Sequence, residues 1–347
     1  MTKVITRYLL PRVAAFATLG LLVGAGGQAS AEGTLTGKAL ADRYSQCWQN
    51  FNEANWDEFL KCYGPGTPSV APGMLPAKGG KAIIDKHAKS FRSAMPDVIG
   101  ELQLMVVSGH NAATIALMHG THSGPLATPA GEIPPTNKRF GQLVAHGIES
   151  GPGAIASKEW FIQDGATLMA QLGLSKNPAR AAMEKGAAAI AGGPVVVATG
   201  SAVEKSNLAA AKKAYALFNH HDKKLAEGAS PDIVDHDQTA PTDITGIAAE
   251  MDHNAGFWQM SSNVKCTTPI LFAAGDYTVA IGQLVGKNDG DAPAMGIKKT
   301  GKSFSLDYIE FIRWKDGKAV ELWPFVNSMQ LAMELGLMPP PAAHAQK

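Results

Sequence analysis

The chain has 347 residues, of which 45% are hydrophobic and 18% are charged, and its formal net charge is +1. This length predicts about two domains, and the apolar content suffices for packed cores, which excludes a largely disordered chain. The nearly neutral charge, without a long basic run, argues against a nucleic-acid-binding surface, so we expect no nucleic-acid partner.

The first 31 residues have the pattern of a secretory signal peptide. Basic residues precede an apolar run at 13–23, and Ala29-Ser30-Ala31 provides the small residues that signal peptidase accepts. The apolar run is shorter than the roughly 20 residues needed to span a bilayer, which disfavours a retained anchor. We therefore expect a periplasmic or secreted protein that begins near Glu32 and has no membrane contact after cleavage.

Export would place the cysteines in an oxidising compartment. A pair such as Cys47 and Cys62 could bridge two early helices, and three buried thiols, Cys266 included, are an equally open alternative. The three cysteines show no CxxC spacing, so we expect no metal site.

A segment at 159–174 returns at 321–337. Each copy contains a Trp, a polar residue four positions later, and an amphipathic helical turn that ends in Leu-Gly-Leu. The polar residue is Asp164 in the first copy and Asn327 in the second. The sequence therefore predicts two copies of one domain.

Each copy begins with helices. Apolar residues recur at helical spacing over 40–51 and over 208–218, and both stripes end in Phe-Asn before a shorter second helix. The period then changes to that of hairpin strands, at 102–107, 113–118, 142–146 and 272–284. A short helix closes each copy, so the order predicts an α+β fold with helices on one face of a curved, largely antiparallel sheet.

The domain boundaries follow from this repeat. We predict a first domain at 35–175, an Ala- and Gly-rich linker with at most one short helix at 176–204, a second domain at 205–338 and a frayed tail at 339–347. Because like copies commonly pair, we also expect the two domains to pair within the chain.

Several motifs of the first copy occur in a recognisable order. They are Met95-Pro96-Asp97, Gly120-Thr121-His122-Ser123-Gly124, Pro134-Pro135-Thr136, Trp160 with Asp164, and Gln171-Leu172-Gly173. Over most of residues 36–175 this order resembles the SnoaL-like polyketide (ester) cyclases of the NTF2-like (nuclear-transport-factor-2-like) superfamily. The resemblance implies two tandem NTF2-like cones, each with helices and a bent sheet around a pocket.

The resemblance also implies chemistry without a metal or an organic cofactor. Such cyclases need a base that removes a proton next to a carbonyl and a donor for the resulting oxyanion. Asp164 is the expected base, with helix capping as its alternative role. His122 is expected to be a proton donor or a polar partner of Asp164, with a loop hydrogen bond as its alternative role.

Five further residues are expected to contact the ligand. They are His146, Trp160, Phe91, Asn327 and Trp323. His146 lies on an apolar strand, so one step of alternation decides whether it faces the pocket. Trp160 has burial in the core as its alternative.

The second copy departs from the family pattern. Residues 282–286 stand where the His-containing motif would be, and Asn327 replaces the aspartate, so we expect the same fold without its acid/base residue. Asp235-His236-Asp237 looks metal-like, but consecutive strand residues alternate between faces and would not share one metal. We expect solvated or capping roles there, with a second pocket as the weaker alternative.

Two functions remain open at this point. One is an exported enzyme of the ester cyclase type, with intramolecular aldol chemistry in the first domain. The other is a non-catalytic protein whose cones bind a hydrophobic small molecule or pair with each other. This fold hosts both kinds of function, so the choice depends on the site.

Overall fold

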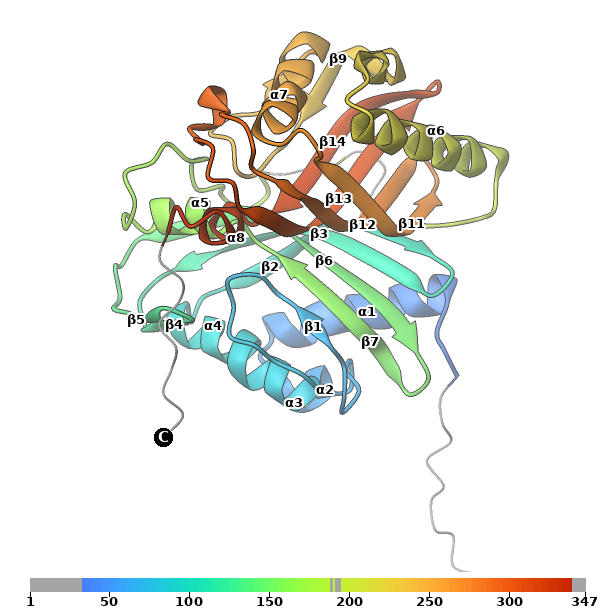
Figure 1. Cartoon of the computed structure of the whole chain (residues 1–347). Coiled ribbons are helices and arrows are strands. Elements are labelled where there is room, and N and C mark those ends of the chain that lie inside the picture. Colours follow the sequence, from blue (N-terminus) through green and yellow to red (C-terminus); the bar gives the residue numbers. More distant parts are fainter. Residues whose placement is uncertain (1–32, 188–189, 191–194, 339–347) are drawn as a thin grey trace, which may run out of the picture. The chain divides into compact units, whose positions relative to one another are not determined.

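The computed structural model describes residues 33–187, 190 and 195–338 (Figure 1). By their contacts they belong to one unit, Glu32–Lys347. The predicted signal peptide and the predicted tail lie outside the described residues. Among the residues that are described, no helix is both long enough and apolar enough to cross a membrane.

The chain forms two six-stranded sheets, each accompanied by helices (Figure 1). The first half contains α1 (Gly37–Asn52), α2 (Trp56–Leu60), β1 (Ser69–Val70), α3 (Gly80–Ile83), the π-helical segment η1 (Ile84–Ala88), α4 (Lys89–Ala94), β2 (Ile99–Ser108), β3 (Asn111–Thr121), β4 (Leu126–Thr128), β5 (Gly131–Ile133), β6 (Arg139–Gly151), β7 (Ala154–Ile162), α5 (Gly165–Gln171) and β8 (Val195–Val197). The second half contains α6 (Ala202–Asn219), the 3-10 segment η2 (Lys223–Gly228), β9 (Ala229–Asp235), β10 (Ile244–Thr245), α7 (Ile247–Met260), β11 (Lys265–Ala274), β12 (Tyr277–Lys287), the 3-10 segment η3 (Pro293–Met295), β13 (Ser303–Lys315), β14 (Lys318–Val326) and α8 (Ser328–Glu334). The predicted α+β fold with two copies of one domain is confirmed.

The first sheet runs β1-β7-β6-β3-β2-β8 and the second runs β10-β9-β14-β13-β12-β11. Five strands correspond in order, and each sheet has one additional edge strand, β8 in the first and β10 in the second. Their central strands are antiparallel, whereas β1 and β9 run parallel to β7 and β14. The stretch predicted as a linker supplies β8, which pairs with β2, and its described residues hold no helix before Ala202.

Alternate residues of the central strands belong to different cores. On β3, Ala116 and Met118 pack under the helices of the first repeat, whereas Ile115 and Leu117 belong to a core that also contains Phe311 of the second sheet. A strand that is buried on both faces reads as a continuous apolar run instead of an alternating one. This double burial explains why the strand-forming segments of the sequence carry so few polar residues.

Gly147 on β6 marks a close approach between the two sheets. A Cβ atom at this position would lie 2.7 Å from Ile281 Cδ1 and 3.3 Å from Ile309 Cδ1. Because the first distance is shorter than carbon atoms tolerate, a larger residue here would displace the Ile281 side chain or the second sheet.

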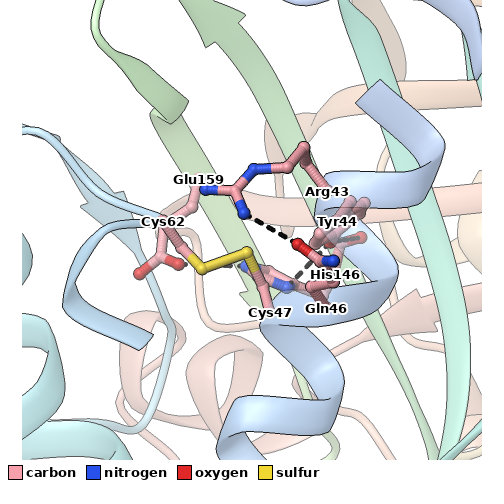
Figure 2. The surroundings of a disulfide bond; sticks show 7 residues. All are labelled: Arg43, Tyr44, Gln46, Cys47, Cys62, His146 and Glu159. Carbon is pink, nitrogen blue, oxygen red and sulfur yellow. Dashed lines mark hydrogen bonds and ion pairs between the residues drawn. A yellow bond between two sulfur atoms is a disulfide. The ribbon is translucent and has the colours of Figure 1, made fainter. Parts of the chain in front are cut away.

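Cys47 on α1 and Cys62 just after α2 form a disulfide whose Cα atoms are 6.1 Å apart (Figure 2). Cys266 is free. The disulfide fixes α1 against the segment that follows α2, and these elements form one wall of the first repeat's interior.

Candidate functional site

The first repeat encloses a cavity of about 80 Å³ between its helices and the inner face of its sheet. Its lining is mostly aromatic and aliphatic. The polar side chains that face it are Tyr44, Tyr63, His87, His146 and Glu159. An apolar cavity with a few convergent polar groups is the usual form of a small-molecule site.

The centre of this polar group is a buried pair of side chains on neighbouring strands (Figure 2). His146 Nε2 on β6 lies 3.0 Å from Glu159 Oε2 on β7. The two residues are only 8% and 2% exposed. A buried carboxylate needs such a partner, because leaving it unpaired in apolar surroundings would cost several kcal/mol.

The hydroxyl of Tyr44, on α1, contacts the histidine of this pair. Its hydroxyl lies 2.8 Å from His146 Nδ1 and 3.0 Å from the His146 carbonyl oxygen. The hydroxyl has one proton. It can therefore donate either to His146 Nδ1 or to the His146 carbonyl oxygen, so Tyr44 holds the imidazole in place beside Glu159.

The surroundings of Glu159 keep its carboxylate ionised. Burial acts to raise the pKa of Glu159, but the hydrogen bond and charge of His146 outweigh it, with smaller contributions from Ser69 and His87. The pKa of Glu159 therefore lies below its usual value. An ionised carboxylate in a water-poor cavity is a candidate base.

Two further polar groups face the same space. His87 lies on η1, where its Nε2 is 2.6 Å from the Leu75 carbonyl oxygen. Single π-helical turns occur often at functional sites. Burial, and then the charge of Glu159, raise the pKa of Tyr63 well above its usual value, so its hydroxyl remains a hydrogen-bond donor.

A wider hollow of about 380 Å³ adjoins this cavity. The two spaces share the lining residues Met74, His87, Phe91 and Phe161. Residues of the second repeat also border the hollow, namely Asn327, Met329, Met333 and Met338. Methionine side chains adapt to apolar ligands of varied shape.

Asp164 lies outside the lining of both spaces and acts as the N-cap of α5. Its Oδ2 accepts a hydrogen bond from the Thr167 backbone N–H at 2.8 Å. Its Oδ1 accepts from the Ser328 backbone N–H at 2.9 Å and also from the Ser328 hydroxyl. The carboxylate thus joins the N-termini of the closing helices of the two repeats, which corresponds to the capping alternative.

His122 is buried at the end of β3 and lines neither space. Its Nδ1 accepts a hydrogen bond from the Thr136 backbone N–H at 3.3 Å. Burial lowers the pKa of His122, which favours the neutral ring. Within the described residues, His122 and Asp164 share no hydrogen bond, so the structure does not bring the two expected catalytic residues together.

The five expected ligand contacts fall into three places. His146 and Phe91 line the cavity. Asn327 borders the wider hollow and caps α8. Trp160 and Trp323 lie in the core between the sheets, where they face away from the cavities.

Glu159 was not among the predicted site residues, although the sequence contained a signal for it. Trp160 belongs to the core between the sheets, so alternation turns Glu159 and Phe161 toward the opposite face. Phe161 pairs with His146 across the sheet, which brings the acid and the imidazole to one side. For His87 no comparable signal was found in the sequence, because the helical run from α3 to α4 was not predicted.

The Asp235-His236-Asp237 motif is divided between two faces, as predicted. Asp235 and Asp237 line a cavity of the second repeat, and the His236 ring stacks on Trp323 with centroids 5.0 Å apart. The expected solvated role is wrong, because the two aspartates are only 2% and 4% exposed. Asp237 does hold a turn, in which its side chain accepts from Thr239.

The sequence model of the SnoaL-like polyketide cyclases matches residues 38–172 and 209–335. The chain belongs to the SnoaL-like polyketide cyclase family. Its two repeats are two SnoaL-like domains in tandem. No curated protein matches the chain.

Solved structures match this SnoaL-like chain over the length of one repeat. AclR from Streptomyces galilaeus is 23% identical, with a TM-score of 0.36, over 39% of this chain and 84% of its own. TsrD from Streptomyces laurentii is 21% identical, with a TM-score of 0.35, over 39% and 97%. An NTF2-like protein from Burkholderia xenovorans is 19% identical, with a TM-score of 0.31, over 38% and 97%.

Proposed function

We propose that this protein is an exported acid/base enzyme that acts, without a cofactor, on a small carbonyl compound in the cavity of the first repeat. The reaction would be of the ester cyclase type, an intramolecular aldol closure. The hydrogen-bonded pair of His146 and Glu159 at the wall of an apolar cavity carries this proposal. Membership of the SnoaL-like family supports the reaction class.

The proposed reaction moves one proton around the network. Glu159 removes a proton from the carbon next to a carbonyl, and the resulting enolate attacks a second carbonyl of the same molecule. The new alkoxide takes a proton from His146, which recovers one from Glu159. The Tyr63 hydroxyl faces the same cavity and is the proposed donor to the developing charge. General acid/base catalysis of this kind contributes about 10²- to 10⁴-fold.

The dimensions of the two spaces restrict the substrate. A cavity of about 80 Å³ admits only the reacting end of a ligand. The adjoining hollow of about 380 Å³, bordered by apolar and methionine side chains, has room for the remainder. We therefore propose a hydrophobic ligand that extends from Glu159 outward past Phe91.

We further propose that the second repeat takes the place that a partner subunit would have in a homodimer. Contacts across the repeats support this pairing. Asn327 Nδ2 donates to the Pro72 carbonyl oxygen at 2.9 Å, and Asp164 accepts from Ser328. A covalent tandem makes such an association intramolecular, which raises the effective concentration of the partner.

Export to the periplasm or the medium is proposed from the N-terminal signal pattern. The Cys47–Cys62 disulfide supports it, because disulfides persist mainly in oxidising compartments. Fractionation of cells that express the full chain tests this proposal. Protein in the periplasm that starts near Glu32 is expected, and full-length protein in the cytoplasm would contradict it.

A non-catalytic binding function is the second candidate. One observation favours it: both ring nitrogens of His146 already have partners in the protein, Tyr44 and Glu159. A binding protein would use the same cavity without moving a proton. The two candidates therefore differ in whether the protein accelerates proton exchange on its ligand.

Deuterium exchange at carbons next to a carbonyl distinguishes the two candidates. The mature protein would be incubated in D₂O with a panel of small ketones, β-ketoesters and lactones, and exchange would be followed by NMR. For an enzyme we expect faster exchange on some panel members, a loss of about 10²-fold or more in Glu159→Gln, and retention in Asp164→Asn. Equal rates in wild type and Glu159→Gln would contradict the proposed base. Native mass spectrometry that finds a bound small molecule, without exchange on it, would favour the binding function.

A further inference from the structure

The second repeat carries its own polar groups at the positions of the first repeat's site. Trp160 and Trp323 occupy the same place in the repeated sequence. The residue after each Trp pairs with His146 in the first sheet and with Glu310 in the second. Glu310 therefore stands where the first repeat has its imidazole.

Two more acidic residues are placed in the same way. On β1 and β9, the strands that run parallel to β7 and β14, Ser69 pairs with the residue before Trp160, and Asp235 pairs with the residue before Trp323. The helix α7 places Glu250 four residues after its N-cap glycine, Gly246, and its side chain faces the interior. The second repeat therefore has acidic groups at positions where the first repeat has an imidazole and a hydroxyl group.

These acids line a cavity of about 170 Å³ among α6, α7 and the inner face of the second sheet. Its carboxyl groups are those of Asp235, Asp237, Glu250 and Glu310. None of the described residues that line it is a lysine or an arginine, and His253 is its one imidazole. Acidic groups thus outnumber basic ones in a cavity whose lining is mostly apolar.

Two of the carboxyl groups have only each other as a possible donor at one oxygen. Asp235 is 2% exposed and Glu250 is 8% exposed, and their carboxyl groups hydrogen-bond to each other, which requires that one of them keeps its proton. Within the described part of the chain, no other residue donates to Asp235 Oδ1 or Glu250 Oε2. By contrast, Tyr215 donates to Glu310, and Thr239 donates to Asp237. Two ionised carboxylates at this place would lack a donor, which is unfavourable for buried acceptors, so these atoms mark a place where a donor from a ligand can replace the shared proton.

The electrostatics of the cavity favour a cation. Burial, and then the charges of neighbouring acids, raise the pKa of Asp235 well above its usual value. Burial raises the pKa of Glu250 to about 7, although Asn254 and Asp235 oppose the rise. A positive charge between the two acids would remove their mutual repulsion and favour their ionised forms.

The side chains that line this cavity indicate an organic cation. Aromatic side chains surround the acids, namely Tyr215, Phe218, Phe257, Tyr308 and Trp314. Aromatic faces attract organic ammonium groups. Among the described residues, no three His, Cys, Asp or Glu side chains are arranged to hold a metal ion. A dry cavity of about 150 Å³ holds a benzene ring, so a ring with a short amine fits here.

We propose that this second cavity binds a small primary amine with an apolar body, whose ammonium group donates to Asp235 and Glu250. The proposal concerns the second repeat alone and does not depend on the function proposed for the first. The acceptors are fixed on β9 and α7, so the ammonium group would bridge the sheet and the helix that covers it.

Calorimetric titration of the full mature chain with benzylamine, and with benzyl alcohol as its neutral isostere, tests this proposal. We expect benzylamine to bind at least about tenfold more tightly than the alcohol. In the double variant Asp235→Asn/Glu250→Gln this preference should disappear. Asp232→Asn, on the exposed part of the same strand, is the matched control and should bind benzylamine as wild type does.

Three results would overturn the proposal. The first is equal binding of amine and alcohol by the wild type. The second is benzylamine binding that the double variant retains but Glu159→Gln loses, which would place the amine in the first repeat. The third is a rise in melting temperature with Mg²⁺ or Ca²⁺ that needs Asp235 and Glu250 and that benzylamine does not produce.

Discussion

His146 Nε2 lies 3.0 Å from Glu159 Oε2, and both side chains are buried against the cavity of the first repeat. Removal of one partner of such a pair leaves the other without compensation. We expect Glu159→Ala to lower the free energy of unfolding by about 3 kcal/mol, and Glu159→Gln by less, because the amide oxygen still accepts from His146. Urea denaturation at neutral pH measures both variants.

The pH dependence of this effect has a defined sign. The folded-state pKa of Glu159 lies below the usual value of 4.5, so its stabilisation is present above that pH and is lost as the pH falls through the folded-state value. Glu149→Ala, on the same hairpin with a side chain 33% exposed, is the control. If Glu159→Ala proved as mild as Glu149→Ala, the buried pair would not exist in solution.

The disulfide should stabilise the wall of the same cavity. Cys47 and Cys62 are 15 residues apart in sequence, and closure of such a loop restricts the unfolded chain by about 3 kcal/mol. We therefore expect Cys47→Ser/Cys62→Ser to lower the free energy of unfolding by about that amount. Dithiothreitol should lower the melting temperature of wild type but not that of the double variant. Equal sensitivity of both proteins to dithiothreitol would show that these cysteines are not bonded.

The sequence predicted the fold well because its signals are local and repeated. The helical stripe that ends at Phe51 and its counterpart that ends at Phe218 each predicted a helix, and the structure has α1 and α6 there. Strand β8 was missed because Val195–Val197 is short and lies next to Ala- and Gly-rich residues. Its place at the sheet edge depends on pairing with β2, which is a long-range contact.

The candidate site was only partly predictable for a related reason. His146 was singled out, but its partner Glu159 is adjacent only across the strands β6 and β7. Asp164 has a residue type and a position that suit both a base and a cap, and only its contacts with Thr167 and Ser328 distinguish the two. Sequence spacing gives the candidates, whereas the partners of each side chain decide their roles.

Asp164 should act on stability through the closing helices. Replacement of an N-cap by alanine costs about 0.5–2 kcal/mol, and asparagine caps nearly as well as aspartate. We therefore expect Asp164→Ala to destabilise the protein by about 2 kcal/mol, because it also loses the contact with Ser328, and Asp164→Asn to cost clearly less. Hydrogen exchange at the Thr167 and Ser328 amides should accelerate in the alanine variant. Unchanged protection at both amides would contradict the capping role.

The acidic cavity of the second repeat should make stability fall as the pH rises. Burial raises the folded-state pKa of Glu250 from 4.5 to about 7, so the folded protein keeps a proton that the unfolded chain has lost. The contribution of Glu250 to stability is therefore complete below about pH 4.5 and is lost as the pH rises through about 7, by on the order of 3 kcal/mol at most. The groups that face Glu250 in the cavity are Tyr215, Asp235, Asp237, His253, Cys266, Tyr308 and Glu310.

Glu250→Gln isolates this contribution. The amide cannot ionise, so the free energy of unfolding of the variant should change less between pH 5 and pH 7.5 than that of wild type. Asp232→Asn, exposed on β9, should leave the wild-type pH profile unchanged. Parallel profiles for wild type and Glu250→Gln would show that Glu250 is not forced to keep its proton in the folded state.

The close packing of the two sheets predicts that a larger side chain at Gly147 destabilises the protein. A Cβ at Gly147 would lie 2.7 Å from Ile281 Cδ1, so Gly147→Val must move one sheet or force Ile281 from its rotamer. Overpacking of this kind typically costs about 1–3 kcal/mol. Gly228→Ala, where a Cβ meets nothing within 4 Å, is the matched control and should change stability little.

If the repeats pair as proposed, Gly147→Val should also split the single unfolding transition into two, because each repeat then unfolds with less support from the other. A single transition with the stability of Gly228→Ala would mean that the sheets do not pack on each other in solution.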